Sequence, residues 1–290
     1  MTDQTEVVNP TLLTRERRQE FEDRGFLVIR DALTSSTVES LLEAHDRVYE
    51  EERAAKRLGP GGSLHLFAFV LRDDRFIELL DVPTTFPLVW GILGWNIYMY
   101  HCHLDVHQPV RAQASPKWSW HQDGGRQNLE IETAPTRPRL SVKIAYFLTD
   151  VSEPGRGNFM VLPGSHRSNS LTRPRHDELG FDQPEGAMPI LAEPGTAVLF
   201  DRRLWHSRSE NRSDLTRKAV FLGYTYRWIR PRDDYPIRPE LFTRLSPIRR
   251  QLLGGGRDAM SYWGLGEEEA PLQAWLAGRG LLDSASAPHR

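Results

Sequence analysis

Three side chains that can hold one metal ion occur as a closely spaced pair and a distant third residue. His121 and Asp123 would point to the same face of an extended strand, so an imidazole and a carboxylate can bind one ion from neighbouring positions. His206 follows a strand-like run at residues 196–200 and can supply the third ligand. Two histidines and one carboxylate on one face of a metal, with the opposite positions open, form the ligand set of non-haem Fe(II) oxygenases. The sequence therefore predicts a mononuclear Fe(II) site.

A second group of possible metal ligands lies on and just after the segment 96–106, which we predict to be extended. In a strand His101, His103, Asp105 and His107 would share one face. A strand rises about 3.3 Å per residue, which spreads these four side chains too far for all of them to bind one ion. The group remains an alternative metal site, and we favour a role in lining a polar cavity.

Length and composition restrict the class of protein. One domain with helical additions is the simplest interpretation of 290 residues, and 39% hydrophobic with 26% charged residues is ordinary for a soluble globular chain. A net charge of -2 gives no broad basic field and argues against a nucleic-acid partner. The single cysteine, Cys102, excludes an intrachain disulfide and fits a reducing compartment. No signal-peptide pattern and no apolar run of about 18 residues occurs, so we predict a cytoplasmic protein without a membrane segment.

The N-terminal part is predicted to be mostly helical. The predicted elements are a helix at 15–24, a strand at 26–29, an amphipathic helix at 36–56, an extended segment at 65–69 and a short helix at 72–80. Ser36 and Glu39 have the spacing of a capping box at the start of the amphipathic helix. His45 lies on the apolar side of that helix, which indicates a packed core histidine.

The remaining chain is predicted to be mostly β. Strands are expected at 140–148, 157–162, 195–200 and 218–226, and helices at 239–253 and 272–276. Short strands separated by turns, without regular helices between them, favour an antiparallel sandwich or jelly roll. Lys143 in the middle of a strand is unusual, so its ammonium must either reach the edge or meet an anion inside. The polar segment 167–189 is predicted to be a long loop that covers a site, with a solvated surface loop as the alternative.

Taken together, the motifs resemble those of the phytanoyl-CoA dioxygenase-like family of Fe(II)/2-oxoglutarate oxygenases, over about residues 21–226. The matching motifs are Trp120-His121-Gln122-Asp123, the stretch from Gly157 through Pro163-Gly164-Ser165-His166, Trp205-His206 followed by Asn211 and Arg217, and Leu252-Leu253-Gly254 in a C-terminal extension. A lone His-x-Asp pair is weak evidence. Its occurrence in order with the Pro-Gly-Ser-His turn and a downstream histidine and arginine makes the resemblance specific.

The resemblance implies a mainly β fold, the double-stranded β-helix (jelly roll, cupin-like), with N-terminal and C-terminal helices. It implies one oxygenase domain over 1–290, with helical support at 1–95, a jelly-roll core at 96–228 and a helical extension at 229–290. His121, Asp123 and His206 would hold the iron, and Arg217 would pair with the distal carboxylate of 2-oxoglutarate through two parallel hydrogen bonds. Ser207, His101 and Lys143 lie close to family positions that line the cosubstrate site, whereas His166 is interpreted as structural.

The chemistry that the resemblance implies consumes Fe(II)-bound 2-oxoglutarate and dioxygen, and its usual product is an alcohol formed at an unactivated C–H bond of a small molecule. A natural-product intermediate is the preferred substrate class, ahead of an acyl thioester or an amino acid. The candidate substrate contacts are Trp118, Trp120, Arg126, Gln127, Asn128 and Trp205, with Trp228 as a further candidate for an apolar pocket.

Several alternatives remain open at this level. Desaturation, epoxidation and cyclisation use the same metal ligands as hydroxylation. A non-catalytic jelly-roll binding protein is the alternative that is not an enzyme. A halogenase is disfavoured because Asp123 fills the position that it would leave vacant. The sequence does not predict the oligomeric state. The arginines near the C-terminus are interpreted mostly as a solvated face, with the alternative that one of them meets an acidic substrate group; they are Arg227, Arg230, Arg232, Arg238, Arg249 and Arg250.

Overall fold

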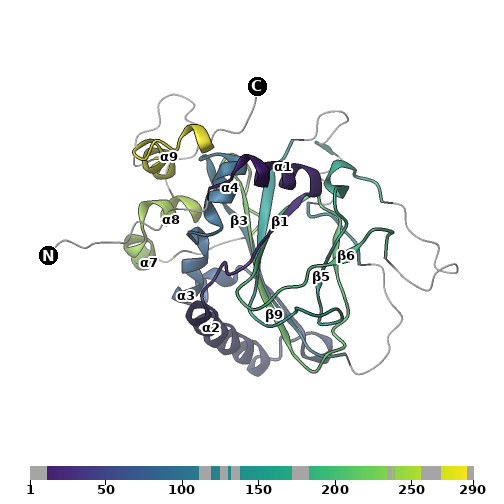
Figure 1. The fold of residues 1–290 in the computed structure, drawn as a ribbon. Helices are drawn as coiled ribbons and strands as arrows, with labels where there is room; N and C mark the ends of the chain where they lie inside the picture. Colours follow the sequence, from purple (N-terminus) through teal and green to yellow (C-terminus); the bar gives the residue numbers. More distant parts are fainter. Residues whose placement is uncertain are drawn as a thin grey trace.

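The computed structural model describes residues 12–110, 119–124, 130–131, 138–171, 183–233, 237, 239–255 and 269–285. Two antiparallel sheets form its centre, a six-stranded sheet in the order β1-β7-β4-β9-β3-β2 and a three-stranded sheet in the order β6-β5-β8 (Figure 1). The strands are β1 (Phe26–Ile29), β2 (Leu64–Phe67), β3 (Ile97–His107), β4 (Ser141–Phe147), β5 (Phe159–Val161), β6 (Met188–Pro189), β7 (Ala197–Asp201), β8 (His206–Arg208) and β9 (Arg217–Tyr226). The described chain is thus mainly β, as predicted.

The two faces of the large sheet bury different cores, because side chains alternate along each strand. In β4, Ala145 and Phe147 belong to a cluster that also contains Phe159 and Val161 of the small sheet. The intervening Ile144 and Tyr146 belong to a larger cluster under the helices. The first core therefore lies between the sheets, and the second lies between the large sheet and the helices.

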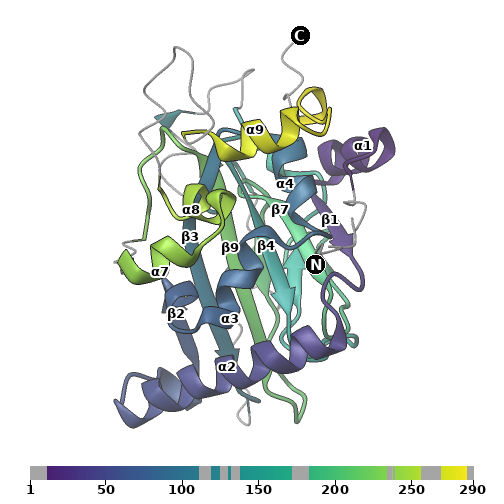
Figure 2. The same cartoon turned by 90° about the vertical axis from the view of Figure 1, so that its left-hand side faces the viewer.

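Helices cover the outer face of the large sheet (Figure 2). The α-helices are α1 (Arg15–Arg24), α2 (Ser35–Ala54), α3 (Asp74–Ile77), α4 (Phe86–Leu93), α7 (Pro239–Arg244), α8 (Pro247–Leu252) and α9 (Pro271–Ala277). Short 3-10 helices are η1 (Pro60–Gly62), η2 (Phe69–Leu71), η3 (Glu78–Asp81), η4 (Ser165–Arg167) and η5 (Asp283–Ala285). Both the N-terminal and the C-terminal helices thus pack on one side of the sheet.

The helix ends show where local chemistry sets the boundaries. Thr14 caps α1 by accepting a hydrogen bond from the backbone N–H of Arg17, and Gly25 ends the helix in the left-handed region at φ 83°. The predicted capping box at Ser36 is wrong. Thr34 is the N-cap of α2, since its extended backbone places its hydroxyl 3.2 Å from the N–H of Thr37.

Other boundaries differ modestly from the prediction. The predicted short helix at 72–80 is split into α3 and η3, and the predicted helix at 239–253 is split into α7 and α8, where Ser246 caps the second helix and Pro247 begins it. β6 lies in the segment predicted to be a loop, of which residues 172–182 lie outside the described residues.

No single helix among the described residues is long and apolar enough to cross a membrane. The bent pair Asp74–Asp81 and Phe86–Leu93 passes such a test by length and composition alone. Every residue of α4 is buried in the protein.

Candidate active site

A cavity of about 1100 Å³ opens beside the large sheet. Its lining comes from β2, β3, β4, β5, β7, β8 and β9, from Ser119 and residues 121–124, and from the segment after β9. Strands far apart in sequence therefore contribute to one concave surface, which is the usual setting for a small-molecule site.

The three predicted metal ligands meet on the wall of this cavity. His121 pairs with His206 in an isolated antiparallel bridge, in which each backbone N–H donates to the other residue's carbonyl at 3.0 Å. Oδ2 of Asp123 lies 3.7 Å from Nε2 of His206. One ligand atom from each of the three residues lies within 4.8 Å of the other two, so the structure brings the predicted set together.

The two imidazoles are oriented by their own backbone. Nδ1 of His121 lies 2.8 Å from the carbonyl of Ser119, and Nδ1 of His206 lies 2.8 Å from the carbonyl of Leu204. A carbonyl can only accept, so each Nδ1 donates and each neutral ring keeps its lone pair on Nε2. Burial, together with the neighbouring His121, lowers the pKa of His206 to about 3. The ring of His206 is therefore neutral at neutral pH, as a metal ligand must be.

Lys143 accounts for the ionisation of Asp123. Burial alone would raise the pKa of Asp123, but the Lys143 ammonium, 2.9 Å from Oδ2, and the imidazoles of His206 and His121 hold it below the usual aspartate value. The buried lysine thus meets an anion inside, the second of the two alternatives left by the sequence. The donor set of two imidazoles and one ionised carboxylate fits Fe(II).

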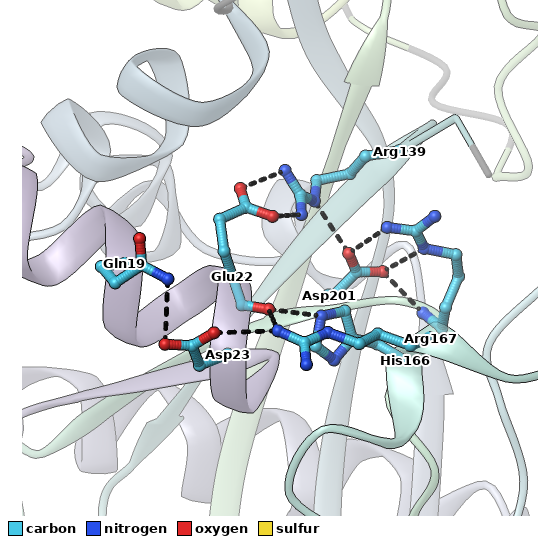
Figure 3. Close-up of polar contacts among 8 residues, drawn as sticks. Gln19, Glu22, Asp23, Arg139, His166, Arg167 and Asp201 are labelled. Atoms are coloured by element: carbon cyan, nitrogen blue, oxygen red, sulfur yellow. Dashed lines mark hydrogen bonds and ion pairs between the residues drawn. The ribbon is translucent and has the colours of Figure 1, made fainter. Parts of the chain in front are cut away.

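An ion-pair cluster fixes the turn that leads from β7 to His206 (Figure 3). The fully buried carboxylate of Asp201 accepts from Nε of Arg139 at 2.8 Å and from Nη2 of Arg203 at 2.7 Å. Arg139 also donates to both carboxylate oxygens of Glu22 on α1. Burial would raise the pKa of Asp201, but the two guanidinium groups hold it well below the usual value. The cluster connects α1, β7 and the start of β4 behind the site.

His166 lies at the same junction. Its Nε2 is 3.1 Å from the carbonyl of Glu22, and a Cβ on Gly25 would come within 2.5 Å of its Nδ1. The Pro-Gly-Ser-His turn is therefore packed against the end of α1, and Gly25 provides the space that the ring needs.

Arg217 begins β9 and is almost completely buried on the cavity wall. Its Nη1 lies 3.4 Å from Oδ2 of Asp105, and its guanidinium lies over the rings of Phe147 and Phe221. Nε of Arg217 has no hydrogen-bond partner among the described residues. A buried guanidinium with an open donor is suited to a carboxylate of a bound molecule.

Ser207 and His101 also line the cavity. The Ser207 hydroxyl lies 2.5 Å from the hydroxyl of Ser119. Nδ1 of His101 lies 2.8 Å from Asp233, and its Nε2 lies 3.0 Å from Nδ1 of His103. Both ring nitrogens of His101 are thus bound within the protein. Asp233 was missed by sequence reasoning because it lies 132 residues from its partner and belongs to no motif.

Two members of the alternative ligand group, His103 and Asp105, line the cavity together with a residue of β2. His65 of β2, with His103 and Asp105 of β3, forms the second set whose ligand atoms lie within 4.8 Å of one another among the described residues. Asp105 already accepts from Nδ1 of His65 at 2.5 Å and lies beside the Arg217 guanidinium. The carboxylate of Asp105 is therefore already engaged by an imidazole and a guanidinium of the protein.

The candidate substrate residues differ in whether the structure describes them and in whether they line the cavity. Trp118, Arg126, Gln127 and Asn128 lie outside the described residues. Trp120 is buried, and the indole N–H of Trp205 donates to the carbonyl of Ser168 at 3.1 Å. Neither of these two side chains is part of the cavity lining, whereas Trp228 is.

Two solved structures share the fold. HygX from Streptomyces hygroscopicus, with nickel and 2-oxoglutarate bound, superposes with a TM-score of 0.59 at 18% identity, covering 79% of this chain and 94% of HygX. SnoK, a non-haem alpha-ketoglutarate-dependent carbocyclase from nogalamycin biosynthesis, gives 0.56 at 21% identity and covers 81% and 91%. The predicted jelly roll with flanking helices is confirmed.

Sequence comparisons point to the family that the motifs resemble. L-proline trans-4-hydroxylase from Streptomyces griseoviridis is 27% identical over 247 residues, covering 74% of this chain and 87% of the hydroxylase. The family model of phytanoyl-CoA dioxygenase matches residues 21–219, which is more than half of the chain. The chain therefore belongs to the phytanoyl-CoA dioxygenase family of Fe(II)- and 2-oxoglutarate-dependent oxygenases.

Proposed function

We propose that this dioxygenase hydroxylates an unactivated C–H bond of a small molecule, a natural-product biosynthetic intermediate, with His121, Asp123 and His206 as its iron ligands. One observation carries the assignment of the ligands. Both histidines commit Nδ1 to a backbone carbonyl, which leaves two Nε2 lone pairs beside an ionised carboxylate on a cavity wall. The chemistry that Fe(II) and 2-oxoglutarate supply when bound is activation of dioxygen for C–H oxidation, with succinate and carbon dioxide as by-products.

The cosubstrate is proposed to bind between the metal ligands and Arg217. The open Nε donor and the buried position of Arg217 support its pairing with the distal carboxylate of 2-oxoglutarate. Ser207 offers a hydroxyl at the same wall, and Lys143 keeps Asp123 ionised before a metal arrives. His101 is proposed to shape the site through His103, since its ring nitrogens have protein partners.

A small-molecule substrate is supported by the cavity and by the relatives. The name of the L-proline trans-4-hydroxylase gives proline as the substrate of that relative. SnoK is described as a carbocyclase from nogalamycin biosynthesis. Cyclisation is the second candidate reaction, because SnoK, a carbocyclase, shares the fold of this chain. Product mass separates the two, since hydroxylation adds one oxygen atom and ring closure by oxidation removes two hydrogen atoms.

Anaerobic titration with Fe(II) and 2-oxoglutarate, followed by their visible charge-transfer band, tests the site directly. Wild-type protein should develop the band. Asp123→Ala should lose it and should lose 2-oxoglutarate turnover by about a hundredfold or more, because even partners of metal ligands contribute 10–100-fold. Arg244→Gln, at an exposed position on α7, is the matched control and should behave as wild type. A normal band and normal turnover in Asp123→Ala would exclude this ligand set.

A further inference from the structure

The arginines that follow β9 fall into two groups. Arg227 donates to the carbonyl of Glu269 at 2.7 Å, and Arg249 pairs with Glu78 and Asp81. These side chains connect the C-terminal segments to the body of the protein. Arg230 and Arg232 instead line the cavity, whereas Arg238 lies outside the described residues.

The segment that carries Arg230 and Arg232 is held against β3. The N–H of Ile229 donates to the carbonyl of Tyr226 at 3.0 Å, and the hydroxyl of Tyr98 donates to the carbonyl of Ile229. The N–H of Arg232 donates to the carbonyl of Tyr100 at 2.9 Å. Both arginines therefore extend from backbone that is fixed before any ligand binds, which lowers the entropy cost of binding.

The described cavity lining has a surplus of positive charge. Its cationic side chains are Lys143, Arg202, Arg208, Arg217, Arg230 and Arg232, whereas Asp105 and Asp123 are its carboxylates. The surplus is four charges in a chain whose net charge is -2. Fe(II) would add two positive charges and the 2-oxoglutarate dianion would remove two, so the surplus persists in the loaded enzyme. No described carboxylate forms an ion pair with Arg230 or Arg232, and a further anion would reduce the repulsion between them.

Apolar surface lies beside these cations. Phe67 is 46% exposed and Trp228 is 55% exposed, and both line the cavity. The guanidinium of Arg232 lies 5.2 Å from the ring centroid of Phe67, and Trp228 stacks on Tyr226. Large exposed aromatic side chains in a cavity indicate contact with an apolar part of a ligand.

We propose that Arg230 and Arg232 form an anion subsite that binds a carboxylate or phosphate group of the substrate, while Phe67 and Trp228 contact its apolar body. The substrate is then an amphipathic organic anion. This inference rests on the proposed function, because it names the substrate class of the same site. The subsite is separate from Arg217, so substrate and 2-oxoglutarate each have their own cationic partner.

The test uses three probes of similar size: phenylbutyrate, its neutral amide, and phenylpropyl phosphate. Binding is measured by calorimetry on full-length protein loaded anaerobically with Fe(II) and saturating 2-oxoglutarate, which keeps the probes away from Arg217. At least one of the two anions should bind about tenfold more tightly than the amide, as expected for charge-assisted hydrogen bonds. The anion that binds more tightly identifies which group the substrate carries.

The double variant Arg230→Gln/Arg232→Gln should lose this preference and keep its affinity for 2-oxoglutarate. Arg244→Gln removes the same kind of charge outside the cavity and should keep the preference. Equal binding of acid and amide, a preference that survives in the double variant, or no anion binding at about 10 mM would each overturn the inference. Failure of the proposed function looks different, because the charge-transfer band would then be missing from the wild-type protein before any probe is added.

Discussion

At the scale of single residues, the pairing of Arg217 with Asp105 decides how the proposed cosubstrate anchor behaves. Only one donor of the guanidinium is directed at Asp105, at 3.4 Å, and Nε has no partner among the described residues. A dicarboxylate can therefore bind without first breaking a short ion pair. The same contact holds the arginine in place when no cosubstrate is present.

Arg217→Leu should raise the dissociation constant for 2-oxoglutarate about tenfold or more and leave Fe(II) binding intact, because it removes a charge-assisted donor and no metal ligand. Titration of the charge-transfer band with 2-oxoglutarate measures this constant. Thermal melting controls for any loss of stability when the buried Asp105 loses one of its partners. An unchanged constant would move the anchor elsewhere, and Lys143 would be the next residue to substitute.

The candidate site residues that the sequence indicates lie in locally spaced pairs. His121 and Asp123 are two positions apart, and the distance of eleven positions from His206 to Arg217 matches the family pattern. The roles of His65 and Asp233 had no such signal. Their partners, Asp105 and His101, lie 40 and 132 residues away, so only the pairing of strands reveals them.

At the scale of elements, the ion pairs that join α1, β7 and the start of β4 should contribute measurably to the free energy of unfolding. Asp201→Asn removes the buried charge shared by Arg139 and Arg203, and it should destabilise the protein by about 3 kcal/mol at neutral pH. Urea unfolding of wild type and variant measures the difference. Gln19→Leu, at an exposed position on α1, is a control that should change stability little.

The pH dependence of that difference follows from the direction of the pKa shift. Asp201 has a folded-state pKa below its ordinary value of 3.8, so its contribution is complete above pH about 4 and is lost as the pH falls below that value. The stability difference between wild type and Asp201→Asn should therefore shrink on acidification. A difference that stays constant from pH 7 to about 3 would show that the charge of Asp201 does not stabilise the fold.

Helices were predictable where their signals are local and complete. The bounds of α1 agree with the prediction because Thr14 and Gly25 mark its ends. Helix α4 was not predicted, since its residues 86–93 are apolar on every side and buried, and a helix without a polar face has no amphipathic period. Strand order within the sheet could not be predicted, because it depends on pairings between distant segments.

At the scale of the whole molecule, the outer core includes side chains from both ends of the described chain. Phe21 and Leu41 from the N-terminal helices and Leu252 and Leu272 from the C-terminal helices belong to one cluster. We therefore propose that residues 1–290 form a single cooperative domain. Calorimetry should give one transition whose van't Hoff and calorimetric enthalpies agree, whereas two transitions would show that the C-terminal extension folds separately.

Gln251 connects that extension to the sheet. Its buried amide donates to the carbonyls of Trp95 and Ile97, each at 3.0 Å, and accepts from the N–H of Leu272 at 3.1 Å. Gln251→Leu should cost about 2 kcal/mol or more of unfolding free energy, because these buried backbone groups lose their partner. The same urea measurement applies, and a loss no larger than that of Gln19→Leu would contradict the expected role of Gln251.

The antiparallel pairing of β3 with β9 has a consequence for folding during translation. Ile97 lies opposite Tyr226 and His107 lies opposite Arg217, so more than 100 residues separate each strand position from its partner. At about 5–20 residues per second, β3 emerges roughly 5–25 s before β9 has been made. During that time β3 has no β9 strand to pair with, although in the finished sheet it lies between β9 and β2. We therefore expect the yield of folded protein in a cell to change with the speed of translation.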